Sequence, residues 1–199
     1  MKKLSYILSI FCLMISPAIF AQDDGQAKLR PANLDFSKLE AELDAYLKSK
    51  PEDKQESEIK RVGIIKQFKK MVQKIINRSP YEGKIYLKKK SLFAKIISAD
   101  DDALEVKTSR GTSKVKWESL NIRQYSEIFI AAAAAKINPD TAAEDYPVAF
   151  SKAANYYFVI AVFYDWYNNA AASKVFRKKA LILNPELKSK IDQLWASAG

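Results

Sequence analysis

The spacing of the apolar residues changes twice along the chain, and this change constrains the fold more than any other feature. Between residues 81 and 120 apolar side chains alternate with polar neighbours, as in Lys84-Ile85-Tyr86-Leu87-Lys88. Before and after this segment they recur every three or four positions. Alternation is typical of half-buried β-strands, and the longer spacing is typical of amphipathic helices. The chain is therefore predicted to be of the α+β class, with one small sheet between helical segments.

Four short strands are predicted in the alternating segment. They cover residues 84–88, 92–98, 104–108 and 115–117, with turns at residues 99–102 and 110–111. Short strands joined by tight turns predict an antiparallel sheet. A flat, open sheet of about 35 residues buries little apolar area. We therefore expect a barrel-like module over residues 80–120, with helices covering its open edge.

Two helices are predicted before the sheet, over residues 35–79. The first follows a capping box at Ser37 and Glu40 and ends at Pro51, and residues 52–58 are predicted to form a turn. The second helix is predicted over residues 58–77. Its apolar face consists of Ile64, Ile65, Phe68, Met71, Val72, Ile75 and Ile76. Arg61 falls within this apolar sector.

Helices are also predicted throughout residues 121–199. The first is expected within residues 119–137, the second over 147–167, the third over 170–183, and a last one around Leu187, Ile191 and Leu194. The second contains nine consecutive apolar residues, from Tyr156 to Tyr164. A run of this length is too short to span a membrane, so it predicts a buried helix.

Residues 154–187 resemble a tetratricopeptide repeat, a pair of antiparallel helices with fixed small and aromatic positions. The matching residues are Tyr157, Ile160, Ala161, Tyr164, Ala180 and Pro185, and Ala172 and Phe176 lie one place early. The resemblance implies a helical hairpin whose concave face binds a protein partner. On this sequence the partner-binding positions would be Asn155, Phe158, Val162 and Asp165.

Residues 81–120 resemble small Sm-like or Src-homology-type barrels. The resemblance rests on the strand rhythm, on the placement of the turns, and on Trp117-Glu118-Ser119-Leu120 as the closing turn. It implies a curled four-stranded sheet.

The first 21 residues have the layout of a secretory signal peptide. Lys2 and Lys3 precede an apolar run from Leu4 to Ile15, and small residues follow at Ala18 and Ala21. Cleavage is expected after Ala21, with Ala18 as the alternative, and residues 22–34 are expected to form a flexible lead. The protein is thus predicted to be exported to a periplasmic or extracellular location.

The composition excludes several kinds of site. The chain has no histidine, and its one cysteine, Cys12, lies in the predicted signal peptide. Zinc sites built from Cys or His, Ser–His–Asp triads and disulfides are therefore excluded from the mature protein. Nor does a phosphate-binding glycine loop occur. We predict a non-enzymatic interaction or scaffold protein that needs no metal or other cofactor.

Positive charge is concentrated between residues 60 and 95, where 12 Lys and Arg residues stand against one acid, Glu82. Such an excess attracts polyanions, so an anionic envelope polymer or lipid is the alternative partner. Nucleic acid is not expected physiologically if the protein is exported. The alternative without a ligand is a solvated helix face, together with lysines that guard strand edges. The predicted polyanion-binding residues are Lys66, Lys69, Lys70, Lys74, Lys88, Lys89 and Lys90.

Overall fold

The computed structural model describes residues 39–48, 52–137, 143–167 and 169–195. The predicted signal peptide, the lead over 22–34 and Ser37 of the capping box lie outside these residues. The fold is α+β, as predicted. In chain order the elements are α2 (Leu39–Lys48), α3 (Glu52–Arg78), β1 (Tyr81–Tyr86), β2 (Ser91–Ala99), β3 (Ala103–Thr108), β4 (Gly111–Lys116), η3 (Trp117–Ser119), α4 (Ile122–Lys136), η4 (Ala143–Asp145), α5 (Tyr146–Trp166), α6 (Ala170–Leu183) and α7 (Leu187–Trp195).

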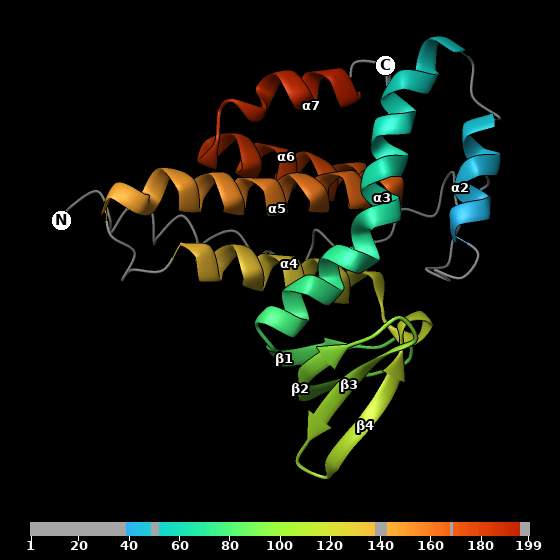
Figure 1. Cartoon of the computed structure of the whole chain (residues 1–199), viewed down its shortest axis with the longest axis vertical. Helices are drawn as coiled ribbons and strands as arrows, with labels where there is room; N and C mark the ends of the chain where they lie inside the picture. The colour runs from blue at the N-terminus through green and yellow to red at the C-terminus, as the bar shows by residue number, and fades with distance from the viewer. Residues whose placement is uncertain (1–38, 49–51, 138–142, 168, 196–199) are drawn as a thin grey trace.

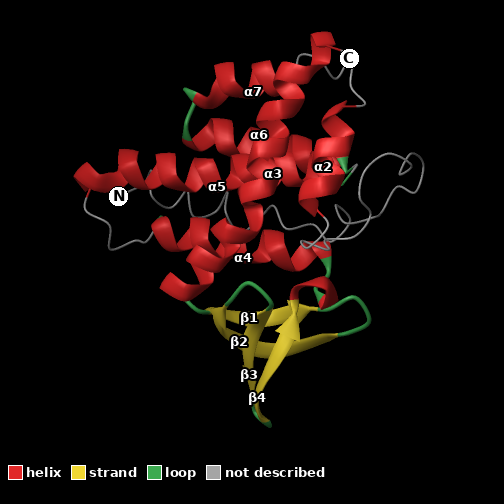
Figure 2. Cartoon of the chain, turned by 45° about the vertical axis from the view of Figure 1, so that its right-hand side comes forward, coloured by secondary structure: helices red, strands yellow, loops and turns green. Residues whose placement is uncertain are grey.

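The sheet lies at one end of the molecule and the helices at the other (Figure 1). Helices α4, α5, α6 and α7 follow one another in layers away from the sheet (Figure 2). The long helix α3 crosses these layers and leads directly into β1 (Figure 1). It is therefore the element that joins the helical part to the sheet.

The four strands are antiparallel and lie in the order β1-β2-β3-β4, which confirms the strand predictions. After η3 the chain comes back to the end of β1, where Leu120 and Leu87 form an isolated β-bridge. The turn between β3 and β4 requires Gly111, whose φ of +126° lies in the region that favours glycine. The inner face of the sheet is fully buried at Ile85, Ile96 and Leu104.

Helix α3 begins six residues earlier than predicted, at Glu52. The prediction of a turn over 52–58 is therefore wrong. This segment is rich in Glu, Lys and Gln, which have high helix propensity, so its charge does not break the helix. An ion pair of 2.8 Å between Glu56 Oε1 and Lys60 Nζ, one turn apart, further favours the helical form.

The core is continuous between the helices and the sheet. On the helical side the ring of Phe68 stacks on Phe163 at 4.2 Å between centroids, and both side chains are buried. On the sheet side Tyr125 of α4 stacks on Trp117, at 6.1 Å. The predicted apolar face of α3 is confirmed, since Ile65, Phe68, Val72 and Ile76 are buried and Ile64, Met71 and Ile75 pack, partly buried, against the same core.

The apolar run from Tyr156 to Tyr164 is buried as predicted, except that Tyr156 and Val159 are partly exposed. Helix α6 packs against it through small residues, and Ala161, Ala172 and Ala180 are all completely buried. In the described residues no helix is long and apolar enough to cross a membrane.

Arg61 lies in the apolar sector of α3 because carboxylates meet it there. Its Nη1 atom lies 3.3 Å from Glu58 Oε1 and 3.0 Å from Asp165 Oδ2, and Nη2 donates to the carbonyl oxygen of Leu194. The guanidinium also lies over the ring of Trp195, with its Cζ atom 5.3 Å from the ring centroid. This one side chain therefore links α3, α5 and α7.

Candidate anion-binding surface

Three of the four positions predicted to bind a partner on α5 are turned toward the protein's own interior, and the fourth, Asn155, is exposed. Phe158 is 2% exposed and packs edge-on against Trp195 of α7 at 6.3 Å, and Val162 is 1% exposed. Asp165 pairs with Arg61 of α3. Asn155 is exposed, and its side-chain amide donates to the carbonyl oxygen of Ser151 at 2.9 Å. Helices α3 and α7 thus occupy the face at which the resemblance places a partner.

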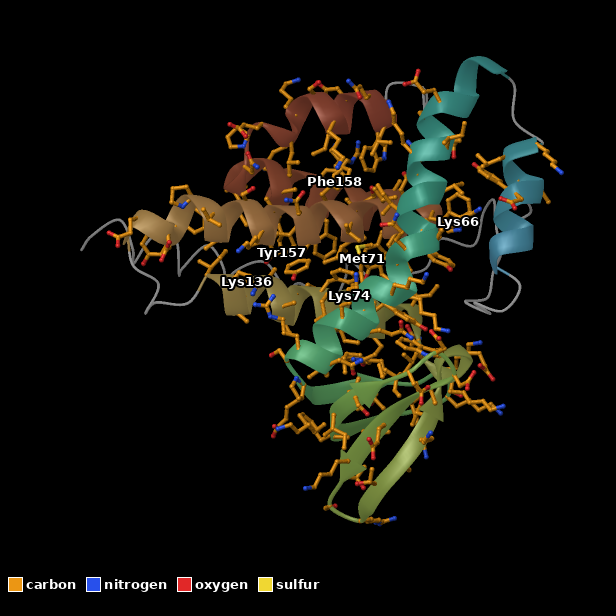
Figure 3. The ribbon with its side chains drawn as sticks, viewed as in Figure 1. Lys66, Met71, Lys74, Lys136, Tyr157 and Phe158 are labelled. Atoms are coloured by element: carbon orange, nitrogen blue, oxygen red, sulfur yellow. The ribbon has the colours of Figure 1, made fainter. Side chains whose placement is uncertain are left out.

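The four predicted lysines of α3 differ in their surroundings. Lys66 Nζ donates to Asp44 Oδ1 of α2 at 2.8 Å. Lys69 donates to the carbonyl oxygen of Asp101 and lies 5.6 Å above the ring of Trp117. Lys70 and Lys74 are exposed. Figure 3 shows Lys66 and Lys74 along α3, with Lys74 nearer to the sheet. Two of the four lysines therefore contact neighbouring elements of the protein, and two face solvent.

Lys70 and Lys74 lie beside an open groove between α3 and the β2–β3 turn. Its volume is about 690 Å³, and its lining consists of Lys70, Gln73, Lys74, Asn77, Arg78, Ala99, Asp100 and Asp101. Three cations thus face two carboxylates. An anion in this groove would meet only a small net positive charge.

The carboxylate of Asp100 stabilises the β2–β3 turn. Its Oδ1 atom accepts from the backbone N–H groups of Asp102 and Ala103 at 2.9 and 2.7 Å. These two bonds lower the pKa of Asp100, and Lys114 lowers it further. The three consecutive aspartates therefore form a hairpin turn, as predicted. In the described part of the chain no three acidic side chains come together as a metal site.

Lys88, Lys89 and Lys90 form the β1–β2 hairpin and are exposed. They lie at the start of β2, whereas the groove beside α3 lies at its end. A strand of this length spans roughly 25 Å, given its rise of about 3.3 Å per residue. The seven predicted lysines thus form two separate groups.

The hairpin lysines are joined by residues that the sequence prediction did not include. In the register of β1 and β2, Lys84 lies directly opposite Phe93, and Lys95 follows Phe93 two positions later. All three therefore point to the same face of the sheet, opposite the buried face of Ile85 and Ile96. Phe93 is 80% exposed. We define the hairpin patch as Lys84, Lys88, Lys89, Lys90, Phe93 and Lys95.

The hairpin patch is strongly cationic. It carries five lysines, and Glu82 is the one carboxylate between residues 81 and 99. Glu82 Oε2 lies 3.4 Å from Lys95 Nζ. Lys84 Nζ lies 5.4 Å from the ring centroid of Tyr86. The net charge of the patch with Glu82 is therefore about +4, higher than that of the groove beside α3.

Strand register carries the signal that could have identified Phe93. Residues 92–98 were interpreted as an apolar run, which does not separate the two faces of a strand. Leu92, Ala94 and Ile96 occupy the inner positions, so Phe93 between them must face outward.

Comparisons of the chain with protein-family models, curated proteins and solved structures find no match.

Proposed function

We propose that this protein is an exported, non-enzymatic binding protein whose ligand is an anionic polymer or surface, held by the hairpin patch. One observation carries the proposal. Lys84 and Lys95 flank an exposed aromatic ring on the open face of a sheet, three more lysines form the adjoining β1–β2 turn, and Glu82 is the one carboxylate between residues 81 and 99. Such a concentration of charge attracts anions over a range of about 10 Å at 0.1 M salt.

The sheet holds the patch in a defined shape. Lys84, Phe93 and Lys95 stand on paired strands, so their spacing follows from the backbone hydrogen bonds. The hairpin itself is closed by a backbone bond from Leu87 N–H to the carbonyl oxygen of Lys90 at 2.8 Å. The backbone N–H of Lys88 also donates to the carbonyl oxygen of Ser119, at 2.9 Å. The backbone beneath these lysines is therefore already ordered and adds no ordering cost when a ligand binds.

A protein partner on α5 is the weaker proposal. Phe158 and Val162 would become accessible only if α7 or α3 moved away, and Asp165 would have to leave Arg61. By contrast, the hairpin patch is accessible without any rearrangement.

Retention on immobilised heparin, measured as the salt concentration of elution, tests the proposal. Lys88→Gln/Lys89→Gln/Lys90→Gln should elute at clearly lower salt than the unchanged protein, because three of the five patch charges are lost. The matched control is Lys152→Gln/Lys174→Gln/Lys178→Gln, which changes the net charge equally at exposed positions of α5 and α6. Equal effects of the two triple variants would contradict a localised site.

Export is tested separately. N-terminal sequencing of the protein recovered from the periplasm or medium should begin at Gln22, or at Ile19 if cleavage follows Ala18. Recovery of the chain in the cytoplasm with Met1 intact would contradict export and leave the binding proposal to the heparin test.

A further inference from the structure

Phe93 is the most exposed large apolar side chain of the described residues. It is 80% exposed, compared with 58% for Ile182, 55% for Ile59 and 54% for Val148. Single exposed apolar residues are common on protein surfaces. Phe93 differs in its neighbours, because Lys84 lies across from it and Lys95 lies next to it on the same face.

The neighbours of Phe93 indicate what could cover it. Lysine stems can pack along an apolar surface, but here the ring remains exposed. An anionic polymer would need the lysines and not the ring. A folded protein would need a shaped pocket for one protruding ring. A lipid headgroup layer uses both the ring and the lysines and needs no shaped pocket. It deforms around a single aromatic side chain, and its phosphates pair with the nearby cations.

We infer that the hairpin patch docks on an anionic phospholipid bilayer, with the Phe93 ring inserted at the boundary of headgroups and acyl chains. This inference rests on the proposed function and names its ligand. Lys88, Lys89 and Lys90 lie a few residues from Phe93 and contact the phosphates around it. The two contributions are of different kinds, electrostatic and apolar, and interfacial binding increases with both the apolar area buried and the attraction to anionic lipids.

Vesicle sedimentation separates the two contributions. The probes are vesicles of phosphatidylcholine with phosphatidylglycerol, and vesicles of phosphatidylcholine alone. The protein should bind the anionic vesicles and release them at high salt. Lys88→Gln/Lys89→Gln/Lys90→Gln should weaken this binding roughly 100-fold, since each lysine near an anionic surface contributes about one factor of five.

Phe93→Ser is the decisive variant. It should weaken binding to anionic vesicles about tenfold or more, because the ring no longer enters the apolar layer. Ile182→Ser is the matched control. It also removes an exposed apolar residue, but this residue belongs to α6 in the helical part and not to the sheet that carries the hairpin patch. All variants carry the same N-terminus, because the apolar run of residues 4–15 has lipid affinity of its own.

Insertion of the ring is measured directly with Phe93→Trp. Lipids brominated on their acyl chains should quench the fluorescence of this variant more strongly than that of the unchanged protein. In the unchanged protein Trp117 and Trp166 are 3% and 1% exposed, and the half-buried Trp195 lies beneath Arg61 and Arg177 in the helical part. Unchanged vesicle affinity of Phe93→Ser, with no extra quenching in Phe93→Trp, would overturn the lipid inference. If the lysine variant still lost heparin retention, the proposed function would stand. If neither patch variant affected any ligand, both would fall.

Discussion

Arg61 of α3 and Asp165 of α5 form an ion pair of 3.0 Å in which the two side chains are only 4% and 18% exposed. Glu58 adds a second carboxylate at 3.3 Å and itself accepts from the hydroxyl of Tyr46 at 3.1 Å. The pair thus lies at the junction of α2, α3 and α5. Buried charges of this kind are tolerated only while each has its partner.

Arg61→Met should strongly destabilise the protein. The methionine side chain fits an apolar site, but Glu58 and Asp165 lose the charge that they face. Removing one partner of a buried ion pair typically costs about 3–5 kcal/mol. Urea unfolding followed by circular dichroism measures the change in free energy of unfolding.

The neighbouring residue provides the control for Arg61. Lys60 pairs with Glu56 at 2.8 Å, yet these side chains are 46% and 84% exposed. Lys60→Met should change the free energy of unfolding by less than about 1 kcal/mol, because exposed ion pairs contribute little. If Arg61→Met and Lys60→Met lowered the free energy of unfolding by similar amounts, the buried pair would contribute no more to stability than the exposed one.

Sequence reasoning located Arg61 within the apolar face of its helix but could not identify its partner. Local spacing determines which face of a helix is apolar, whereas Asp165 belongs to a distant helix. The repeat resemblance assigns Asp165 to partner binding, because it specifies only the position of this residue on α5. Which helix covers that position depends on the tertiary packing of α3 and α7.

Asn77 connects the end of α3 to the sheet through two hydrogen bonds, and the second prediction tests them. Its Nδ2 atom donates to the carbonyl oxygen of Ala99 at 2.9 Å, and its Oδ1 atom accepts from the backbone N–H of Ala99 at 2.8 Å. Asn77→Ala loses both hydrogen bonds and should cost about 1–2 kcal/mol. Faster hydrogen exchange at the Ala99 amide would report the local loss.

Gln67 is the control on the same helix. It is exposed, so Gln67→Ala should change stability by no more than about 0.5 kcal/mol. Unchanged exchange at Ala99 in the Asn77 variant would mean that the backbone alone holds β2 in place.

The strands were predictable because their signal is local. Alternation and turn residues located all four strands, although β4 begins at Gly111, four residues before the predicted start, and Trp117 belongs to η3. The hairpin patch was not predictable as a whole, because it depends on the pairing of Lys84 with Phe93 across two strands. The charge excess of residues 60–95 indicated a cationic surface, but only the sheet shows that Lys70 and Lys88 lie at opposite ends of β2.

The third prediction tests the packing of α5 against α6. Ala161 is completely buried, and Ala161→Phe forces a large ring into a filled site. Overpacking of this kind typically costs about 1–3 kcal/mol and should lower the melting temperature. Val148→Phe introduces the same ring on the same helix at a position that is 54% exposed, and it should have little effect. Equal melting temperatures for Ala161→Phe and the unchanged protein would contradict this helix packing.

The last prediction concerns alkaline pH. Burial raises the pKa of Tyr157 to about 12. It also raises the pKa of Tyr164 to about 12, although the hydrogen bond to Ser126 acts in the opposite direction. In the unfolded chain both phenols ionise near the usual pKa of about 10. The folded state therefore holds these protons more tightly, and the resulting stabilisation is complete below pH 10 and disappears as the pH rises through about 12.

Two measurements check this alkaline prediction. The ultraviolet absorbance of tyrosinate should show a group of tyrosines in the folded protein that ionise near pH 12. The free energy of unfolding should fall between about pH 10 and pH 12, and it should fall less steeply in Tyr157→Phe, which has no phenol to ionise. Tyr157 is the better position for this substitution, because Tyr164→Phe would also break the 2.7 Å hydrogen bond to Ser126. Ionisation of all tyrosines near pH 10 in the folded protein would show that solvent reaches Tyr157, and it would contradict the close packing of α5 against α6 at that position.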